Sequence, residues 1–210
     1  MPHSIARHEA RSAWDWEGFL HECSREILGD SEKVGQIPQV AIHPQRERIG
    51  YPPATPEQIA ETEERLGLVL PHSYKSFLFT TDGWPCGDSW VDHLLPAEQI
   101  DRFAEMSKDW LENWRLGVKY AGGLPPIDDR DYKVYGPHQN PLLVRDDYLE
   151  ATIQISQGDI GVYLLNPLVQ FDKGEWEAWM FESETGARRY KSFWELMHAE
   201  YDRYLELRDI

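Results

Sequence analysis

The residues with the best chemistry for catalysis or metal binding gather in one acidic segment near the middle of the chain. Asp88, Asp92 and His93 supply two carboxylates and an imidazole, which are ligands that a divalent cation accepts. Cys86 precedes them, and a cysteine can act as a nucleophile when a histidine such as His72 takes its proton. Acidic residues are so frequent in this chain that the same cluster is also expected in a solvated loop. A metal-dependent hydrolase is therefore one hypothesis, and a solvated acidic loop is the other.

The chain contains none of the familiar catalytic signatures. A nucleophile elbow, a phosphate-binding loop, a zinc-protease motif and a dinucleotide-binding fingerprint are all missing from the sequence. The carboxylates of Asp128, Asp129 and Asp131 are clustered, but acid–base catalysis would require that one of them is desolvated. The motif search therefore identifies no catalytic residue, and we expect no cofactor and no metal.

Two tryptophans lie in the same acidic segment, where Trp84 and Trp90 are interspersed with aspartates. Large aromatic side chains surrounded by polar groups often anchor protein interfaces. The alternative is that each tryptophan covers the sheet from outside, and the sequence leaves both interpretations open. If the segment is an interface, we expect the partner to contact Asp82, Trp84, Asp88, Trp90, Asp92 and Glu98.

The overall charge limits the classes of partner. The chain has 210 residues, and its 21 Lys and Arg against 37 Asp and Glu give a net charge of −16. Nucleic-acid binders and proteins that dock on anionic lipid need clustered basic residues, so both classes are disfavoured. A basic protein partner is favoured, because such a field would attract it. No signal peptide and no apolar run long enough to span a bilayer is recognisable, so we expect a cytoplasmic protein.

The N-terminal region is predicted to be a helix followed by a linker. Apolar residues recur every three or four positions between Ala13 and Leu28, which indicates an amphipathic helix. Ser31 to Pro53 contains four prolines and is expected to be irregular. We therefore expect residues 1–50 to form a helical extension with a linker, and residues 51–210 to form the main domain.

The main domain is predicted to begin with helices. Thr55 to Gln58 reads as a capping box with proline at the first helical position, and a second helix follows Pro71. A further apolar stripe from Ile100 to Trp114 indicates one helix that stops at Gly117. Ala121 to Pro141 is rich in proline and is expected to be a loop.

The hydrophobic period changes from helical to alternating near Thr152. Short alternating segments between Thr152 and Tyr190, separated by glycine-containing turns, predict a meander of antiparallel strands with a buried strand from Ile160 to Leu165. A capping box at Ser192 opens a final helix. In this predicted order the helices come first, the strands follow and one helix closes the chain. Such an order favours an α+β fold.

One string within this region resembles a known family. From Glu63 to Leu78 the chain reads E-x-x-L-G-x-x-L-P-x-x-Y-K-x-F-L, and Asp82-Gly83-Trp84 follows soon after. This region is similar to the opening of the SUKH superfamily, of the Smi/Knr type, and the similarity extends over roughly Tyr51 to Tyr204. The segment from Lys108 to Pro141 is longer than this pattern needs. It is either part of a partner interface or an insertion with no role in binding.

The resemblance implies an α+β fold with a central, mainly antiparallel sheet flanked by helices. It also implies function by binding, because bacterial members look like immunity proteins that neutralise a polymorphic toxin, often a nuclease or a deaminase. A toxin that acts on nucleic acid usually has a basic substrate cleft, which an acidic inhibitor can occupy. The alternative implied by the yeast branch is a non-catalytic scaffold in signalling or cell-wall regulation.

Overall fold

The computed structural model describes residues 14–43, 47–85, 92–124 and 126–208. The first part of the chain is mainly helical, and its elements are α1 (Trp16–Leu28), α2 (Ser31–Gln36), η2 (Gln39–Ala41), β1 (Ile42–His43), β2 (Arg48–Ile49), α3 (Pro56–Leu66) and α4 (His72–Leu78). The middle part contains β3 (His93–Leu94), η4 (Ala97–Gln99), β4 (Asp101–Arg102), α5 (Phe103–Met106), α6 (Lys108–Tyr120), α7 (Asp129–Tyr132), η5 (Gly136–His138) and α8 (Asp146–Ala151).

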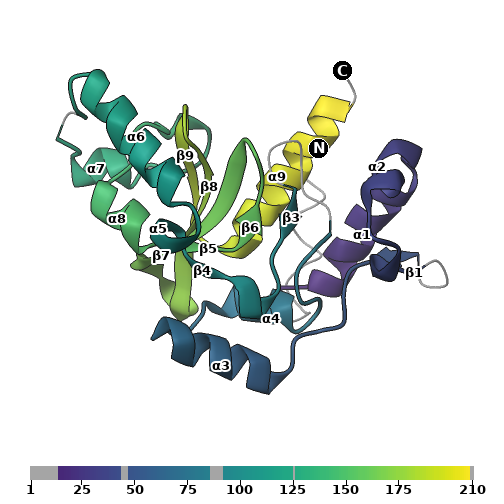
Figure 1. The fold of residues 1–210 in the computed structure, drawn as a ribbon. Coiled ribbons are helices and arrows are strands. Elements are labelled where there is room, and N and C mark those ends of the chain that lie inside the picture. The colour runs from purple at the N-terminus through teal and green to yellow at the C-terminus, as the bar shows by residue number, and fades with distance from the viewer. Residues whose placement is uncertain (1–13, 44–46, 86–91, 125, 209–210) are drawn as a thin grey trace.

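The last part of the chain forms most of the sheet. Its elements are β5 (Ile153–Gln154), β6 (Ser156–Gln157), β7 (Gly161–Phe171), η6 (Asp172–Gly174), β8 (Glu175–Glu182), β9 (Gly186–Tyr190) and α9 (Phe193–Arg208). The main sheet has five antiparallel strands in the order β4-β5-β7-β8-β9, and β3 pairs separately with β6. The α+β fold with an antiparallel sheet and an N-terminal helix is therefore confirmed (Figure 1). Within the described residues, no helix is both long and apolar enough to cross a bilayer.

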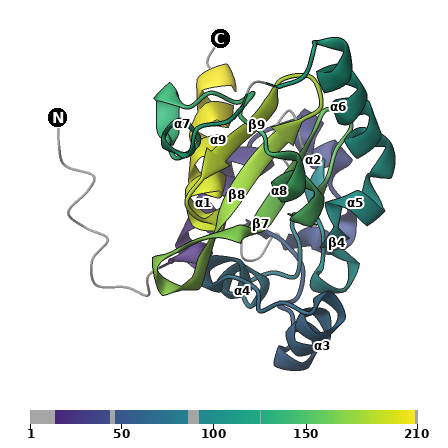
Figure 2. The same cartoon turned by 90° about the vertical axis from the view of Figure 1, so that its left-hand side faces the viewer.

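Both faces of the interior strand β8 are covered, because every one of its residues is buried. Its side chains alternate between two apolar clusters, as the two-residue period of a strand requires. Trp176, Ala178 and Met180 belong to the cluster shared with α1, α3, α4 and α9. Trp179 and Phe181 belong to the cluster on the other face, with side chains of α5, α6 and α8. The helices therefore form two layers with the sheet between them (Figures 1 and 2).

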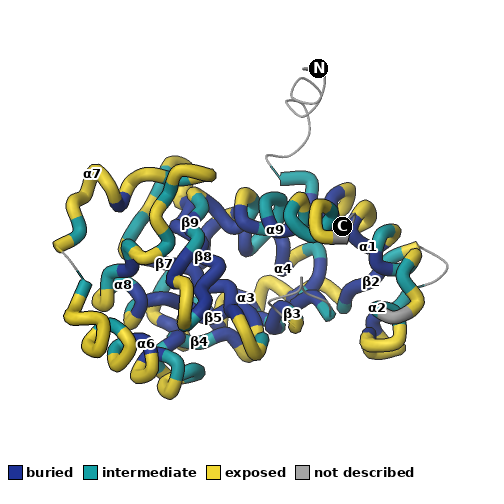
Figure 3. Tube along the Cα trace, turned by 90° about the horizontal axis from the view of Figure 1, so that it is seen from above, coloured by how far each residue is buried: buried dark blue, intermediate teal, exposed yellow. Residues whose placement is uncertain are grey.

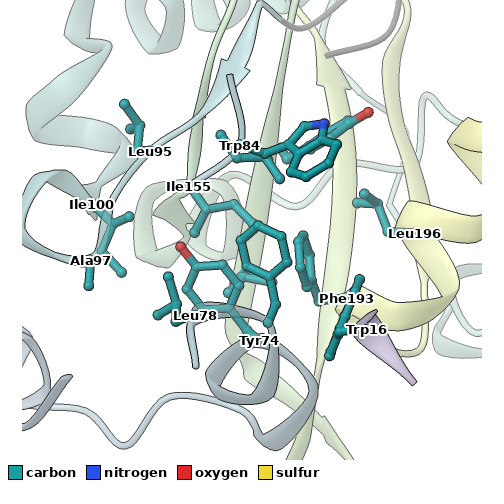
Figure 4. Packing of buried hydrophobic residues seen from close by; sticks show 14 of the residues in the cluster. Trp16, Tyr74, Leu78, Trp84, Leu95, Ala97, Ile100, Ile155, Phe193 and Leu196 are labelled. Carbon is teal, nitrogen blue, oxygen red and sulfur yellow. The ribbon is translucent and has the colours of Figure 1, made fainter. Parts of the chain in front are cut away.

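The N-terminal helix α1 is part of the first cluster. Asp15 caps it by accepting a hydrogen bond from the Gly18 backbone N–H at 3.1 Å. The ring of Trp16 lies 5.3 Å from that of Phe193, and its Nε1 donates to the Ser73 carbonyl at 3.0 Å. Trp16, Phe193 and their neighbours fill the space between α4 and α9 (Figure 4). Since Trp16 is 1% exposed, the helix that precedes the family-like region completes the core of that region.

Two local predictions between residues 100 and 151 were wrong. The predicted single helix after Ile100 is broken at Ser107 into α5 and α6, and α6 continues through Gly117 to Tyr120. The expected loop from 121 to 141 contains α7 and η5, and the helix α8 follows it. Side chains of α6, α7 and α8 form much of the second apolar cluster, so this longer segment covers the second face of the sheet.

A buried carboxylate fastens this segment to the sheet. The Glu177 side chain is fully buried and accepts hydrogen bonds from the hydroxyls of Tyr132 and Tyr135 at 2.8 and 2.7 Å. It also accepts from Asn166 Nδ2 at 2.9 Å and from Trp179 Nε1 at 2.6 Å. Burial, followed by the nearby carboxylate, raises the pKa of Tyr132, so this phenol stays protonated and donates. A buried carboxyl group is tolerated here because several donors surround it.

The outer edge of β9 is covered by the chain that follows η5. The Ala187 N–H donates to the Pro141 carbonyl at 2.9 Å, and Gln139 bonds through its amide to the backbone N–H and carbonyl of Arg189. The approach is so close that a Cβ on Gly186 would lie 2.2 Å from the Pro141 oxygen. Gly186 also has a positive φ of 94°, which favours glycine.

Replacing Trp16 with alanine is expected to destabilise the whole domain. The substitution would leave a cavity among aromatic rings and an unpaired Ser73 carbonyl, with a cost of about 3–5 kcal/mol. The matched control is Tyr120→Ala, because that ring is 82% exposed; it should change stability by less than about 0.5 kcal/mol. Urea unfolding followed by tryptophan fluorescence measures both. Equal stabilities for the two variants would show that α1 is peripheral.

Substitutions of Glu177 test whether the network needs an acceptor or a charge. Glu177→Leu leaves buried donors unsatisfied, at about 1–3 kcal/mol each, and should unfold far more easily. Glu177→Gln keeps one carbonyl oxygen for Asn166 and Trp179, and its amide can donate to the Tyr135 hydroxyl, so most stability should remain. Thermal unfolding of the two variants provides the comparison. A glutamine variant as unstable as the leucine variant would mean that the negative charge itself is required.

Candidate functional site

The acidic segment begins and ends at a fixed point beside the core. Trp84 and Leu94 exchange two backbone hydrogen bonds, at 3.1 and 2.9 Å, and so bring the two ends of the segment together. The turn before Trp84 requires Gly83, whose φ is 90° and where a Cβ would lie 2.8 Å from the Leu94 oxygen. Thr81 Oγ1 accepts from the Tyr51 N–H and donates to the Gly83 carbonyl. Trp84 and Leu94, the two residues that flank the acidic segment, are therefore held in a defined place on the domain.

Asp82 fastens this segment to η4. Its Oδ1 accepts a hydrogen bond from the Ala97 N–H at 2.7 Å. Burial raises the pKa of Asp82, the hydrogen bond from Ala97 opposes the rise, and the nearby charge of Glu98 adds to it. Because one of its oxygens is engaged internally, Asp82 has a structural role whether or not a partner also contacts it.

The other expected partner-binding residues differ in how they are placed. Trp84 is 3% exposed and belongs to the first apolar cluster, so it is a core residue and not an exposed contact (Figure 4). Asp92 and Glu98 are exposed and available to a partner. Asp88 and Trp90 lie outside the described residues. Cys86 lies outside them as well.

The structure brings the turn between β6 and β7 next to Asp92, which the sequence did not reveal. The Asp92 N–H donates to the Gln157 carbonyl at 2.7 Å, and His93 is paired with Gln157 across the β3–β6 ladder. Asp159 and Ile160 follow in the turn, and Ile160 is 52% exposed, not buried as predicted. The sequence indicated the turn after β6. It did not indicate that β6 pairs with β3, because that pairing joins residues far apart in the chain.

Several carboxylates elsewhere in the chain take part in ion pairs or cap a helix. Arg115 makes hydrogen bonds to Asp146 at 2.7 and 2.8 Å and to Glu150 at 2.6 Å, which joins α6 to α8. Arg145 pairs with Asp129, and Asp128 caps α7. In the described part of the chain, no three His, Cys, Asp or Glu side chains are grouped so that they could hold a metal ion.

A comparison with protein-family models covers the region that carries this surface. The model of the SMI1/KNR4 family (SUKH-1) matches residues 53–198, which is well over half of the chain. The chain belongs to the SMI1/KNR4 family. No curated protein shows significant similarity to it.

The family match separates the surface into two parts. Asp82, Trp84, Asp92 and Glu98 lie within the region that matches SMI1/KNR4. Helices α1 and α2 precede it, and α9 continues past its end at residue 198. The face of the molecule beside the acidic segment is therefore built partly from elements that the family pattern does not include.

Two substitutions of Asp82 separate its hydrogen bond from its charge. Asp82→Ala removes the acceptor for the Ala97 N–H and should cost about 1–2 kcal/mol of stability. Asp82→Asn keeps an acceptor oxygen without a charge to bury, so it should be at least as stable as the unaltered chain at pH 7.

The pH dependence has a defined sign. A raised pKa means that the folded state binds the proton more tightly than the unfolded state. The contribution of Asp82 to the free energy of unfolding therefore falls as pH rises through that pKa. The unaltered chain should gain stability relative to Asp82→Asn as pH is lowered from 7 to about 4. Urea unfolding over this range measures the difference. A constant difference would show that the burial of Asp82 carries no electrostatic penalty.

Proposed function

We propose that this chain is an immunity-type protein that binds a cognate bacterial toxin domain and blocks it sterically and electrostatically. The toxin would be one that acts on nucleic acid, such as a nuclease or a deaminase, with a basic substrate cleft. The proposed contacts are Asp82, Asp88, Trp90, Asp92 and Glu98, and the buried Trp84 would contribute by holding this surface in place. The chain itself would have no catalytic role, and the interaction would take place in the cytoplasm.

Family membership is the observation that carries this proposal. The SMI1/KNR4 match fits an immunity-protein role in general and suggests a protein as the partner. The net charge of −16 supports a basic partner, because a field of this sign speeds the association of a cation-rich surface.

The exposed carboxylates beside β3 support the location. Asp92, Asp159 and Glu98 are exposed, and the backbone of Asp92 is hydrogen-bonded to Gln157 at the end of β6. Ile160, which follows Asp159 in the chain, adds an exposed apolar side chain. An apolar contact with a polar rim is the arrangement found at many specific interfaces. The buried Trp84 would act by holding the surface in place.

The direct test is co-expression with the toxin domain encoded by the neighbouring gene. The unaltered chain should rescue growth, and Asp92→Lys combined with Glu98→Lys should weaken binding about tenfold or more through lost steering and new repulsion. Asp147→Lys combined with Glu184→Lys makes the same change of charge at exposed positions away from β3 and should retain binding. Surface plasmon resonance at two salt concentrations gives the rate constants.

The outcomes separate the proposal from its rival. If cells die although both proteins are folded and present, the chain is a scaffold or has a different partner, and a pull-down would then look for it. If both double variants weaken binding equally, the total charge is sufficient and the surface beside β3 is not the interface.

A further inference from the structure

A pocket opens where the N-terminal elements meet the first helices of the family region, and it encloses about 400 Å³. Pockets that bind small molecules commonly have volumes of about 300–1,000 Å³. The Ile49 N–H donates to the Ser24 hydroxyl at 3.0 Å, which holds β2 alongside α1 (Figure 3). The described lining residues come from α1, β1, β2, the chain after β2 and the end of α4, and they are Glu17, His43, Arg48, Gly50, Tyr51, Pro52, Pro53, Phe79 and Thr80.

The wall of this pocket carries a guanidinium group in a fixed orientation. Arg48 Nη2 donates to the Thr80 carbonyl at 2.9 Å, which orients the group. Arg48 Nη1 makes no hydrogen bond to any described residue. The Oε1 atom of Glu17 lies 3.9 Å from it, beyond hydrogen-bond distance, and the Glu17 side chain is 81% exposed. Nη1 is therefore available to a carboxylate that comes closer than Glu17 does, and hydrogen bonds between such charged groups are among the stronger ones in proteins.

The opposite part of the wall is apolar and open to solvent. Phe79 is 47% exposed although its side chain is large and apolar. Pro52 and Pro53 line the same pocket and are exposed as well. Flat side chains of this kind pack well against a ring or a short hydrocarbon chain. The pocket thus combines one cationic group with an apolar surface.

The charges on the wall limit the charge of the occupant. Arg48 supplies one positive charge, and Glu17 adds a negative charge at the rim. A phosphate monoester carries a charge of about −1.5 to −2 at pH 7, so Glu17 would repel it more strongly than a group with one negative charge. A carboxylate matches the single guanidinium better.

We propose that this pocket binds a small monocarboxylic acid, whose carboxylate displaces Glu17 from Arg48 and whose apolar part packs against Phe79. The basic partner proposed above would present lysines and arginines, which Arg48 repels. The pocket is therefore a second site, separate from the surface beside β3.

Hydrogen bonds join the wall of the pocket to the base of the acidic segment. The Tyr51 N–H donates to Thr81 Oγ1 at 2.9 Å, and the Asp82 N–H donates to the Pro52 carbonyl at 3.1 Å. The backbone at Gly50 is so close to this base that a Cβ there would lie 3.0 Å from Thr81 Oγ1. The backbone amide signals of Gly50, Tyr51 and Thr81 therefore report on whether the pocket is occupied.

The experiment titrates the isotope-labelled full chain with sodium phenylacetate and follows these amide signals by NMR. Phenylacetate should shift them in a saturable way. Phenylacetamide has the same shape without the charge and should bind about tenfold more weakly or worse. Phenyl phosphate is the third probe, and it should bind more weakly than phenylacetate because of its greater charge.

Substitutions of the charged residues test the assignment of the carboxylate. Arg48→Gln should weaken phenylacetate binding about tenfold or more. Arg102→Gln is the matched control, because Arg102 also donates to a backbone carbonyl, that of Leu66, but does not line the pocket. Glu17→Gln removes the competing carboxylate and should strengthen binding about two- to fivefold. Glu184→Gln, at an exposed position that does not line the pocket, should leave the affinity unchanged.

A substitution of the apolar wall tests the other half of the ligand. Phe79→Ala should weaken phenylacetate binding about threefold or more, because the ring loses the surface on which it packs. Leu116→Ala is the matched control, since Leu116 is 45% exposed and lies on α6, on the other side of the sheet from α1 (Figures 1 and 3). A thermal melt of each variant confirms that it is folded.

Several results would overturn the proposal. Phenylacetate that fails to shift the amide signals up to about 10 mM would show that the pocket binds no such acid. Equal affinity for phenylacetamide would show that no anion is selected, and tighter binding of phenyl phosphate would show that the anion is a phosphate. If Arg48→Gln does not fold, Glu17→Gln and Phe79→Ala still decide, because unchanged affinity in both would place the ligand elsewhere.

Discussion

Burial of both faces of β8 is the constraint on which the rest of the structure depends. An antiparallel strand in a small domain commonly has one dry face and one wet face, but here the whole strand from Glu175 to Glu182 is buried. The chain must therefore supply two separate apolar layers. The layer around Phe193 is completed by α1, and the layer around Phe181 is completed by the elements between residues 103 and 151. Helix α1 precedes the family match, and the segment from Lys108 to Pro141 is longer than the family pattern needs. Both segments therefore help to cover a face of the sheet.

The features that the sequence predicted well are those determined by neighbouring residues. The stripe of α1 and the capping box at Thr55 depend on residues within one or two turns, and the structure contains both. The alternation along β8 also shows in the sequence, because a strand between two apolar layers still places successive side chains on opposite faces. The features that failed depend on distant contacts. The break at Ser107 coincides with a hydrogen bond from its hydroxyl to Gln154, and no local pattern announces that bond.

The candidate site shows the same division. The sequence identified the acidic segment, since composition alone reveals it, but it did not show which members are exposed. Trp84 is in the core, and the Asp82 carboxylate is engaged by Ala97. The net charge counted from the sequence also includes carboxylates that no partner can reach, because Glu177, Glu182 and Glu200 are buried. Those carboxylates stabilise the interior, so the field that a partner would experience arises from the exposed carboxylates on the surface.

The covered edge of β9 has a consequence for how any partner can be recognised. Many proteins bind peptides by adding a strand to an open sheet edge, which uses backbone hydrogen bonds and is tolerant of sequence. Here the chain from Gln139 to Pro141 already occupies one edge, and the strand at the other edge, β4, has two residues. The two outermost strands of the main sheet therefore offer little backbone for strand addition, which also guards these edges against edge-to-edge aggregation. Recognition at these edges would depend on side chains, and its specificity can change by substitution at the surface while the sheet stays the same.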